Sequence, residues 1–192
     1  MSQNNFNQRK KAVLDKEDKS SIGNWDKKII NLCNKINSFQ NYYTTSSCSG
    51  RAVIMIDQDK KSKGLFIEVS HKEISFEWLK ETLEKIKNNK EFSDKTIKFK
   101  TESPILHVVC KNLEKASKLL EKAKHIGFKR SGINTFGKNI MLELNSTEKI
   151  EFPIIQQNEI LVNDDFLKII VKQVNNKLEK GWEKIKRLEK SL

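Results

Sequence analysis

The chain has 192 residues, of which 36% are hydrophobic and 32% charged, and this composition predicts a folded domain with a core rather than a disordered chain. Its 37 basic and 25 acidic residues give a formal net charge of +12. This excess favours a polyanionic partner, above all nucleic acid, with a merely solvated basic surface as the alternative.

Cysteine and histidine spacing argues against a metal centre. The three cysteines form no C-x-x-C pair and no disulfide framework, and the three histidines lack the spacing of metal ligands. The N-terminus has no apolar signal-peptide core, and no apolar run approaches transmembrane length. We therefore expect no bound metal, no membrane partner and a reducing, cytoplasmic setting.

The first part of the chain predicts an arm, a helix and a hairpin. Residues 1–22 are polar and mostly charged, and we expect a partly flexible basic arm there. From Trp25 the apolar spacing predicts a helix that Asp26 can cap, and the helical period ends near residue 41. Residues 51–57 and 65–71 read as two strands of a hairpin with a loose polar loop, and a second helix follows them.

The middle of the chain predicts two further strands and the clearest helix of the sequence. The strands are residues 96–100 and 104–110. Asn112 can cap the next helix, and Gly127 is placed to end it. The apolar stripe of this helix is formed by Leu113, Ala116, Leu119, Leu120 and Ala123.

The last part predicts a three-stranded meander and a long helix. The meander comprises residues 128–136, 140–146 and 150–155, separated by short polar turns. Asp164 or Asp165 caps the final helix, which Gly181 weakens by about 1 kcal/mol relative to alanine. The expected fold class is therefore α+β, a single domain over residues 1–192. It has a largely antiparallel sheet, packed helices and a long C-terminal helix.

The glycines contain no motif of a nucleotide-binding loop. Neither G-x-G-x-x-G nor G-x-x-x-x-G-K-[ST] occurs among the seven glycines, so the sequence favours a fold outside the Rossmann and P-loop classes. RNA-binding signatures of the RRM type are absent as well.

A hydroxyl-rich segment before the 51–57 strand is the first candidate site. Because it reads as a junction between a helix and a strand, its backbone N–H groups and hydroxyls can hold an anion. Arg51 adds a planar charged fork suited to phosphate or carboxylate. An ordinary serine-rich turn is the alternative, and a nucleophilic Cys48 has little support because no histidine is adjacent in sequence. The candidate residues are Ser46, Ser47, Cys48, Ser49, Gly50 and Arg51.

Two histidines on predicted strands are candidates for proton transfer. His107 lies in an otherwise apolar strand, and His71 ends another strand on its apolar face. Each is either a satisfied core histidine or a neutral imidazole at the floor of a pocket. His125, late in a helix, suits the negative helix end.

Two turns in the second half carry further candidates. One follows a predicted helix cap and contains Lys129, Arg130, Ser131 and Gly132, which form either a basic turn or a phosphate contact. The other, at Ser146 and Thr147, has the composition of ordinary turn chemistry.

Five blocks of the chain resemble the tRNA wybutosine-synthesising protein 3 family. They occur in the family's order and, together with a long basic C-terminal helix, extend along nearly the whole chain, although no short pattern among them is diagnostic by itself. One departure is "ESP" at residues 102–104, where the family often has "EPF". The blocks read "LDKEDKSSIGNWD", "YYTTSSCSGR", "VSHK", "ILHVVCKNLEKASKLLEKAKHIGFKRSGI" and "LELNSTEKIEFPI".

This resemblance implies a methyltransferase that uses S-adenosylmethionine as its co-substrate. Its substrate would be tRNA(Phe), in which it methylates the N4 ring nitrogen of the tricyclic wyosine precursor beside the anticodon. The resemblance also implies a fold outside the common Rossmann methyltransferases. We then expect one cleft to unite residues 46–51, His71, His107 and residues 129–132, with Ser146 and Thr147 as further binding candidates.

Within this cleft His107 is the first candidate base and His71 the second. Arg51 and Arg130 would hold phosphates or the amino-acid tail of the acceptor, and serines would donate hydrogen bonds to ligand. The basic arm and the C-terminal helix would embrace the anticodon loop, or that helix would instead form a homo-oligomer. The rival readings are a non-catalytic RNA-binding module and a hydrolase built on Cys48.

Overall fold

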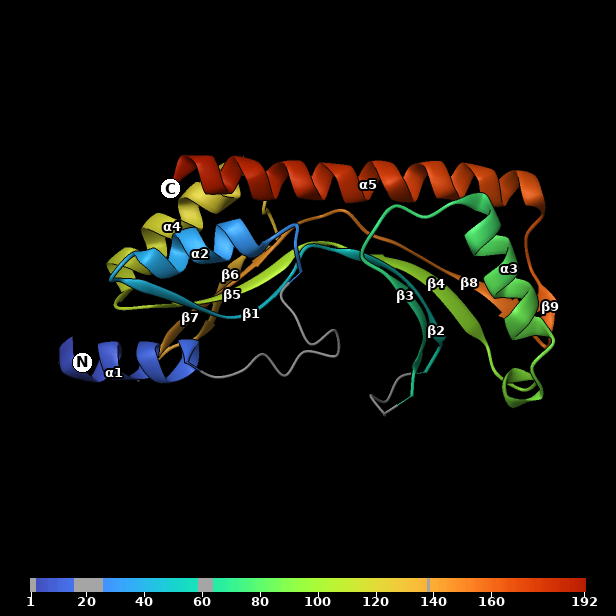
Figure 1. Cartoon of the computed structure of the whole chain (residues 1–192), viewed down its shortest axis with the longest axis horizontal. Helices are drawn as coiled ribbons and strands as arrows, with labels where there is room; N and C mark the ends of the chain where they lie inside the picture. The colour runs from blue at the N-terminus through green and yellow to red at the C-terminus, as the bar shows by residue number, and fades with distance from the viewer. Residues whose placement is uncertain (1–2, 16–25, 59–63, 138) are drawn as a thin grey trace. The chain divides into compact units, whose positions relative to one another are not determined.

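In a computed structural model, residues 3–15, 26–58, 64–137 and 139–192 are described. The chain divides into two compact units. Unit 1 comprises residues 1–49, 104–147 and 181–192, and unit 2 comprises residues 50–103 and 148–180. Each unit contains one antiparallel sheet of its own (Figure 1). The sequence predicts a single domain over the whole chain, and this stays a prediction.

The four-stranded sheet of unit 1 has the strand order β1-β5-β7-β6. Its strands are β1 (Tyr42–Cys48), β5 (Ile105–Cys110), β6 (Gly132–Thr135) and β7 (Ile140–Asn145). The helices of this unit are α1 (Gln3–Leu14), α2 (Ile30–Ser38), α4 (Leu113–Ile126) and the last part of α5 (Asp164–Ser191).

The two faces of the unit 1 sheet are covered differently. On one face α2 and α4 bury alternate strand residues such as Leu106, Val108 and Leu142 (Figure 1). On the other face α1 covers one end of the sheet, where Phe6 packs on Tyr43 and Val109. Burying a phenylalanine stabilises the docked helix by about 1.5–3 kcal/mol. Farther along this second face lie the polar side chains of Ser46, His107 and Glu143.

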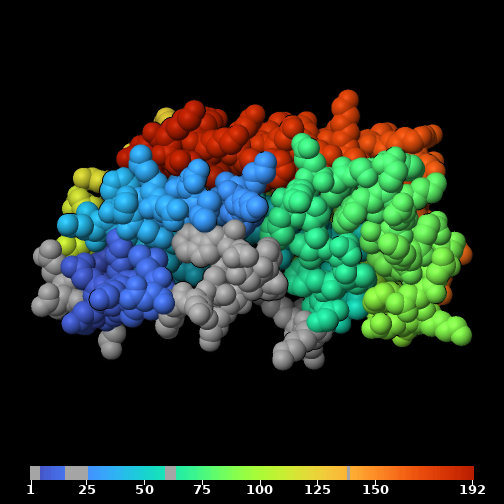
Figure 2. Space-filling model, in the orientation of Figure 1, coloured from blue at the N-terminus to red at the C-terminus, as the bar shows by residue number. Residues whose placement is uncertain are grey.

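The five-stranded sheet of unit 2 has the order β3-β2-β4-β8-β9. Its strands are β2 (Arg51–Ile56), β3 (Phe66–Ser70), β4 (Ile97–Glu102), β8 (Ile150–Gln156) and β9 (Glu159–Ile160). Its helices are α3 (Phe76–Lys87), the 3-10 turn η1 (Lys90–Phe92) and residues 164–180 of α5. On the face of unit 2 seen in Figure 2, much of the surface belongs to α3 and the segment after it.

The α+β class, the antiparallel pairing and the long C-terminal helix are confirmed. The predicted helix cap at Asn112 is confirmed as well, because its side chain accepts a hydrogen bond from Lys115 N; Ser75 caps α3 in the same way by accepting from Trp78 N. At the other end of α4, Gly127 adopts a φ of 120°, the left-handed conformation that favours glycine.

Four predictions of local structure are wrong in detail. The meander is one, because the strand at residues 150–155 pairs with β4 in unit 2 and not with β7. The final helix is capped by Asn163, whose side chain accepts from Phe166 N, rather than by Asp164 or Asp165. Leu113, assigned to an apolar stripe, is 50% exposed. The helix predicted from Trp25 begins only at Ile30, without a side-chain cap, and Asp26 accepts from Lys28 N in the turn before it. Part of the N-terminal arm forms α1, residues 16–25 lie outside the described part, and the flexibility of the arm stays a prediction.

None of the helices in the described part of the chain has an apolar stretch long enough to span a bilayer.

Candidate functional site

A row of polar side chains crosses the open face of the unit 1 sheet. Ser46 Oγ lies 2.6 Å from His107 Nδ1, and His107 Nε2 lies 3.1 Å from Glu143 Oε2. Asn134 Nδ2 donates to the same Glu143 oxygen at 3.2 Å. We call these four residues, Ser46, His107, Glu143 and Asn134, the polar row. The His107 and Glu143 side chains are 25% and 31% exposed, so the row is open to a ligand from solution.

Strand register brings the polar row together. Ser46 is the direct cross-strand partner of His107, and His107 is the partner of Glu143 on the next strand. Side chains of directly opposed residues stand next to each other on one face of a sheet. Residues from three segments far apart in sequence therefore meet without any loop having to hold them.

The carboxyl group of Glu143 is the charged member of the polar row. The hydrogen bond from His107 lowers the pKa of the Glu143 carboxyl, burial opposes this, and Asn145 and Asn134 lower it further. Glu143 is therefore ionised at neutral pH. A half-buried imidazole with a carboxylate on one ring nitrogen and a hydroxyl on the other has the hydrogen-bond partners of a group that can accept and release a proton.

The hydroxyl-rich segment is a strand, not the bend that the sequence predicts. It forms β1, and a β-bulge between Thr44 and Ser46 shifts its register against β5. As a consequence Ser46 faces the polar row, whereas Ser47 hydrogen-bonds the buried thiol of Cys33. The serines of this segment therefore do not act as one cluster.

The end of β1 leads into a tight link to β2. Ser49 N donates to Asp26 Oδ2 at 2.9 Å, and Gly50 has a φ of 100°, which only glycine adopts readily. The Ser49 side chain is fully buried, and its Oγ has no hydrogen-bond partner among the described residues. An orphaned buried hydroxyl costs free energy unless a ligand or water pairs with it, so Ser49 fits a ligand-binding role.

The second predicted turn has both structural and exposed members. Ser131 Oγ donates to Phe128 O at 2.6 Å and accepts from Asn145 N at 3.0 Å, so its hydroxyl joins the start of β6 to the end of β7. Lys129 and Arg130 are exposed, and Gly132 opposes Glu143 in the sheet. At the end of β7, Ser146 is buried and Thr147 is exposed.

Three predicted site residues, Gly50, Arg51 and His71, belong to unit 2. Arg51 Nε bonds Glu102 Oε2 at 2.5 Å, and Lys100 Nζ bonds the other Glu102 oxygen at 2.7 Å. Burial raises the pKa of Glu102, but Lys100 and Arg51 together outweigh it and lower the pKa. Half-buried His71 follows β3 directly. That these residues share one cleft with the polar row stays a prediction.

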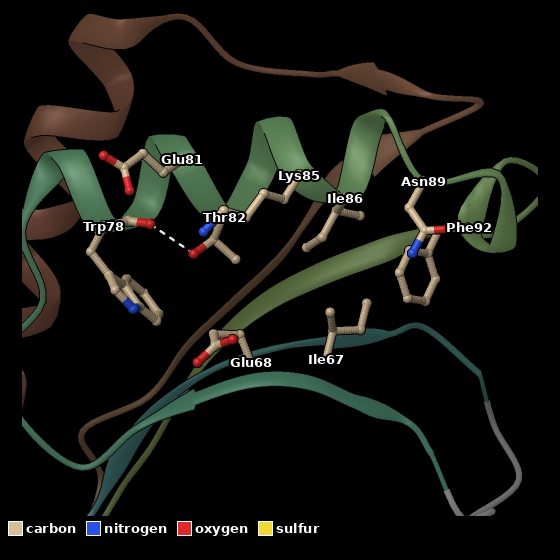
Figure 3. A pocket seen from close by; sticks show the side chains of 9 residues that line it. All are labelled: Ile67, Glu68, Trp78, Glu81, Thr82, Lys85, Ile86, Asn89 and Phe92. Atoms are coloured by element: carbon tan, nitrogen blue, oxygen red, sulfur yellow. Dashed lines mark hydrogen bonds between the residues drawn. The ribbon is translucent and has the colours of Figure 1, made fainter.

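Unit 2 also has a pocket of about 330 Å³ between α3 and β3. Figure 3 shows Trp78, Glu81 and Glu68 toward one end and Phe92 with Asn89 toward the other. Thr82 Oγ1 does not face this space as a free donor, because it bonds Trp78 O at 2.7 Å. None of the site residues predicted from the sequence lines this pocket.

Sequence reasoning missed Glu143 and Asn134. A signal for Glu143 exists, because it is the one charged residue within the apolar strand β7. That it opposes His107 depends on which strands pair, and the sequence does not reveal the pairing.

The strands and the polar row define a class: an α+β protein outside the Rossmann group, with a hydrogen-bonded histidine on an open sheet face. A family model described as Methyltransferase TYW3 matches residues 8–192. The chain therefore belongs to this family of methyltransferases, and the resemblance seen in its motifs is confirmed.

Curated relatives match along nearly the whole chain. A protein of Thermococcus sibiricus is 38% identical over 185 residues, covering 95% of this chain and 91% of the relative. One of Methanocaldococcus jannaschii is 38% identical over 179 residues, covering 91% and 90%. Both are named tRNA(Phe) 7-((3-amino-3-carboxypropyl)-4-demethylwyosine(37)-N(4))-methyltransferase.

The solved structure of the PH1069 protein from Pyrococcus horikoshii has the same fold. It superposes with a TM-score of 0.85 at 36% identity, covering 98% of this chain and 94% of that one. A hypothetical protein from Aeropyrum pernix, at 23% identity and a TM-score of 0.73, shares the fold.

Proposed function

We propose that this chain transfers a methyl group from S-adenosylmethionine to the N4 ring nitrogen of the tricyclic wyosine precursor in tRNA(Phe). Membership of the methyltransferase family supports the reaction class. The names of relatives that are 38% identical support the substrate and the position of methylation. The net charge of +12 supports a nucleic-acid substrate.

The observation that carries the chemistry is the hydrogen-bonded imidazole of the polar row. The acceptor ring nitrogen bears a proton that must leave when the methyl group arrives. His107 is the proposed final holder of this proton, because the Glu143 carboxylate 3.1 Å away stabilises the imidazolium that forms. His71, the second candidate, belongs to unit 2 and orients or binds the base in this proposal.

When bound, S-adenosylmethionine supplies a methyl group on a sulfonium, which reacts by in-line displacement, so positioning dominates catalysis. Ser49 Oγ and Trp182 Nε1 fit its polar groups, since both atoms are buried donors with no partner in the described chain. Lys28 Nζ lies 4.1 Å from the centre of the Trp182 ring and fixes that side chain by a cation–π contact. No metal enters this proposal.

For the tRNA, Arg130 and Arg51 are the proposed phosphate contacts. Arg130 is exposed, whereas Arg51 is already paired with Glu102, so a phosphate would have to compete with that carboxylate. Arg130→Ala should weaken tRNA binding and reduce the salt slope of the affinity by about one unit, and Arg51→Ala should do so less. The anticodon loop is the proposed contact because bases there leave the stack at lower cost than in a duplex.

The test is incubation of the protein with labelled methyl donor and tRNA from cells that lack this activity, followed by nucleoside mass analysis. We expect one added methyl group on the tricyclic base. If a correctly folded protein leaves the tricyclic nucleoside unmethylated, the proposed function is wrong.

A non-catalytic RNA-binding module is the second candidate, because the basic excess would serve it equally well. S-adenosylmethionine separates the two in a thermal-shift assay, since a ligand that binds only the native state raises the melting temperature. A hydrolase built on Cys48 would instead lose turnover on thiol alkylation and need no methyl donor.

A further inference from the structure

The two ring nitrogens of His107 are both engaged within the polar row. Nδ1 faces Ser46 Oγ at 2.6 Å and Nε2 faces Glu143 Oε2 at 3.1 Å. A substrate proton therefore has no direct path to either nitrogen unless one of these hydrogen bonds is given up. A proton can then reach the imidazole only through one of its two hydrogen-bond partners or after one of these hydrogen bonds breaks.

We infer that the Ser46 hydroxyl is a catalytic residue that takes the proton from the acceptor nitrogen while passing its own proton to His107 Nδ1. In this relay Glu143 is a positioning residue that fixes the tautomer of His107. The inference rests on the proposed methyl transfer to a ring nitrogen and adds the route of the proton.

The direction of each hydrogen bond follows from the charge of Glu143. An ionised carboxylate can only accept, and Asn134 Nδ2 donates to the same oxygen, so His107 Nε2 must carry a hydrogen. A neutral imidazole has a hydrogen on one nitrogen only, which leaves Nδ1 as an acceptor. Ser46 must then donate to Nδ1, and its lone pairs remain available to a donor from solution.

Ser46 is placed to meet a substrate. It is exposed, whereas His107 lies deeper in the same row. The bulge in β1 is what turns Ser46 to this face, because in a regular strand Thr45 would oppose His107 and Ser46 would point toward the helices. Bulges re-aim side chains in this way next to active sites.

The relay balances as one concerted step. The acceptor N–H bond breaks and its electron pair stays on nitrogen, which bonds the methyl carbon as the carbon–sulfur pair returns to sulfur. The released proton bonds Ser46 Oγ, and the original hydroxyl proton bonds His107 Nδ1. The ring becomes an imidazolium, held at Nε2 by the Glu143 carboxylate, and it later returns the proton to water.

The first test reads the tautomer without any catalysis. Nitrogen NMR of the whole protein with labelled histidine should show His107 with its proton on Nε2 at a pH where it is neutral. Glu143→Gln should disturb this preference, because an amide can donate as well as accept. A wild-type His107 protonated on Nδ1 would overturn the relay whether or not methylation is observed.

The second test is single-turnover methylation at saturating donor and tRNA. Ser46→Ala should lower the rate by about 100-fold or more, the usual weight of a proton-transfer group, while tRNA affinity stays unchanged. Ser46→Thr should restore part of the rate. Thr45→Ala, which removes the neighbouring exposed hydroxyl, is the matched control and should react like the wild type.

The outcomes separate the relay from the proposed function. If Ser46→Ala reacts at the wild-type rate while His107→Ala does not, the proton reaches the ring directly and the relay is wrong. If the wild type does not methylate the tRNA while its tautomer is as expected, the proposed function fails instead.

The pH dependence of the Glu143→Gln variant tests the positioning role of Glu143. In Glu143→Gln the rate should rise with pH at a lower midpoint than in the wild type, because the imidazolium loses its carboxylate. A loss of stability alone would not shift that midpoint.

Discussion

Replacing Gly181 by alanine should destabilise the protein, although alanine is the better helix former. Gly181 lies inside α5, where a glycine costs about 1 kcal/mol relative to alanine. From the sequence alone the substitution would therefore be expected to stabilise. The structure reverses the sign, because an alanine Cβ at this position would lie 2.8 Å from Pro104 Cγ and 2.9 Å from Pro104 Cδ.

The cost of this clash is set by how far Pro104 can retreat. Its ring is rigid and buried, it directly precedes β5, and its carbonyl accepts from Ser146 N at 3.4 Å. Overpacking of a fixed core costs about 1–3 kcal/mol. Set against the gain of about 1 kcal/mol in helix propensity, we expect a net loss of about 1 kcal/mol for Gly181→Ala.

Urea unfolding followed by circular dichroism measures this difference. Asn176→Ala, on an exposed position of the same helix, is the matched control and should be neutral or slightly stabilising. In the double variant with Pro104→Ala the clash is gone and only the helix-propensity gain remains, so the two substitutions should couple by about 2 kcal/mol. A Gly181→Ala protein more stable than the wild type by the full helix-propensity gain would refute the packing argument.

Three further predictions concern other contacts. Phe6→Ala should release α1 from the unit 1 sheet, at a cost of about 1.5–3 kcal/mol, and protease cleavage within α1 should become faster while the far-UV circular dichroism loses no more signal than one short helix contributes. Because the folded-state pKa of Glu102 is lowered, its pair with Arg51 stabilises the protein above the unfolded-state pKa of about 4.3. The difference in free energy of unfolding between the wild type and Glu102→Gln should therefore shrink as the pH falls below that value. A difference that does not change with pH would contradict this prediction. Burial raises the pKa of the Cys33 thiol to about 11 and that of Cys110 to about 12, so neither should react with iodoacetamide at pH 7.5 in the folded protein, as peptide mass analysis would show.

Local patterns predicted most elements of the fold because each pattern is decided by neighbouring residues. The helix capped at Asn112 and ended at Gly127 appears as expected, since capping and apolar spacing are properties of the segment itself. Strand pairing is different. The segment 150–155 follows β7 in sequence but pairs with β4, and only long-range packing decides between those partners.

The same distinction applies to the candidate site. His107 and Ser46 could be named from the sequence because an imidazole and hydroxyls stand out in strand patterns. The polar row itself could not be named, since it requires the β1–β5–β7 register that sets Ser46, His107 and Glu143 side by side. The sequence also suggested one serine cluster, whereas strand alternation sends Ser47 to the opposite face.

The bulge in β1 explains both this failure and the character of the site. Before the bulge Tyr43 faces outward and packs under α1, and Thr44 faces the helices with 5% of its surface exposed. Regular alternation would continue with Thr45 outward and Ser46 inward, which would separate the Ser46 hydroxyl from His107. The extra residue in the bulge changes which residues of β1 point to each face. The same strand therefore packs an apolar side chain against α1 at one end and places a hydroxyl beside the imidazole at the other. The side chain that the proposed proton route needs is thus selected by a backbone irregularity rather than by its place in a motif.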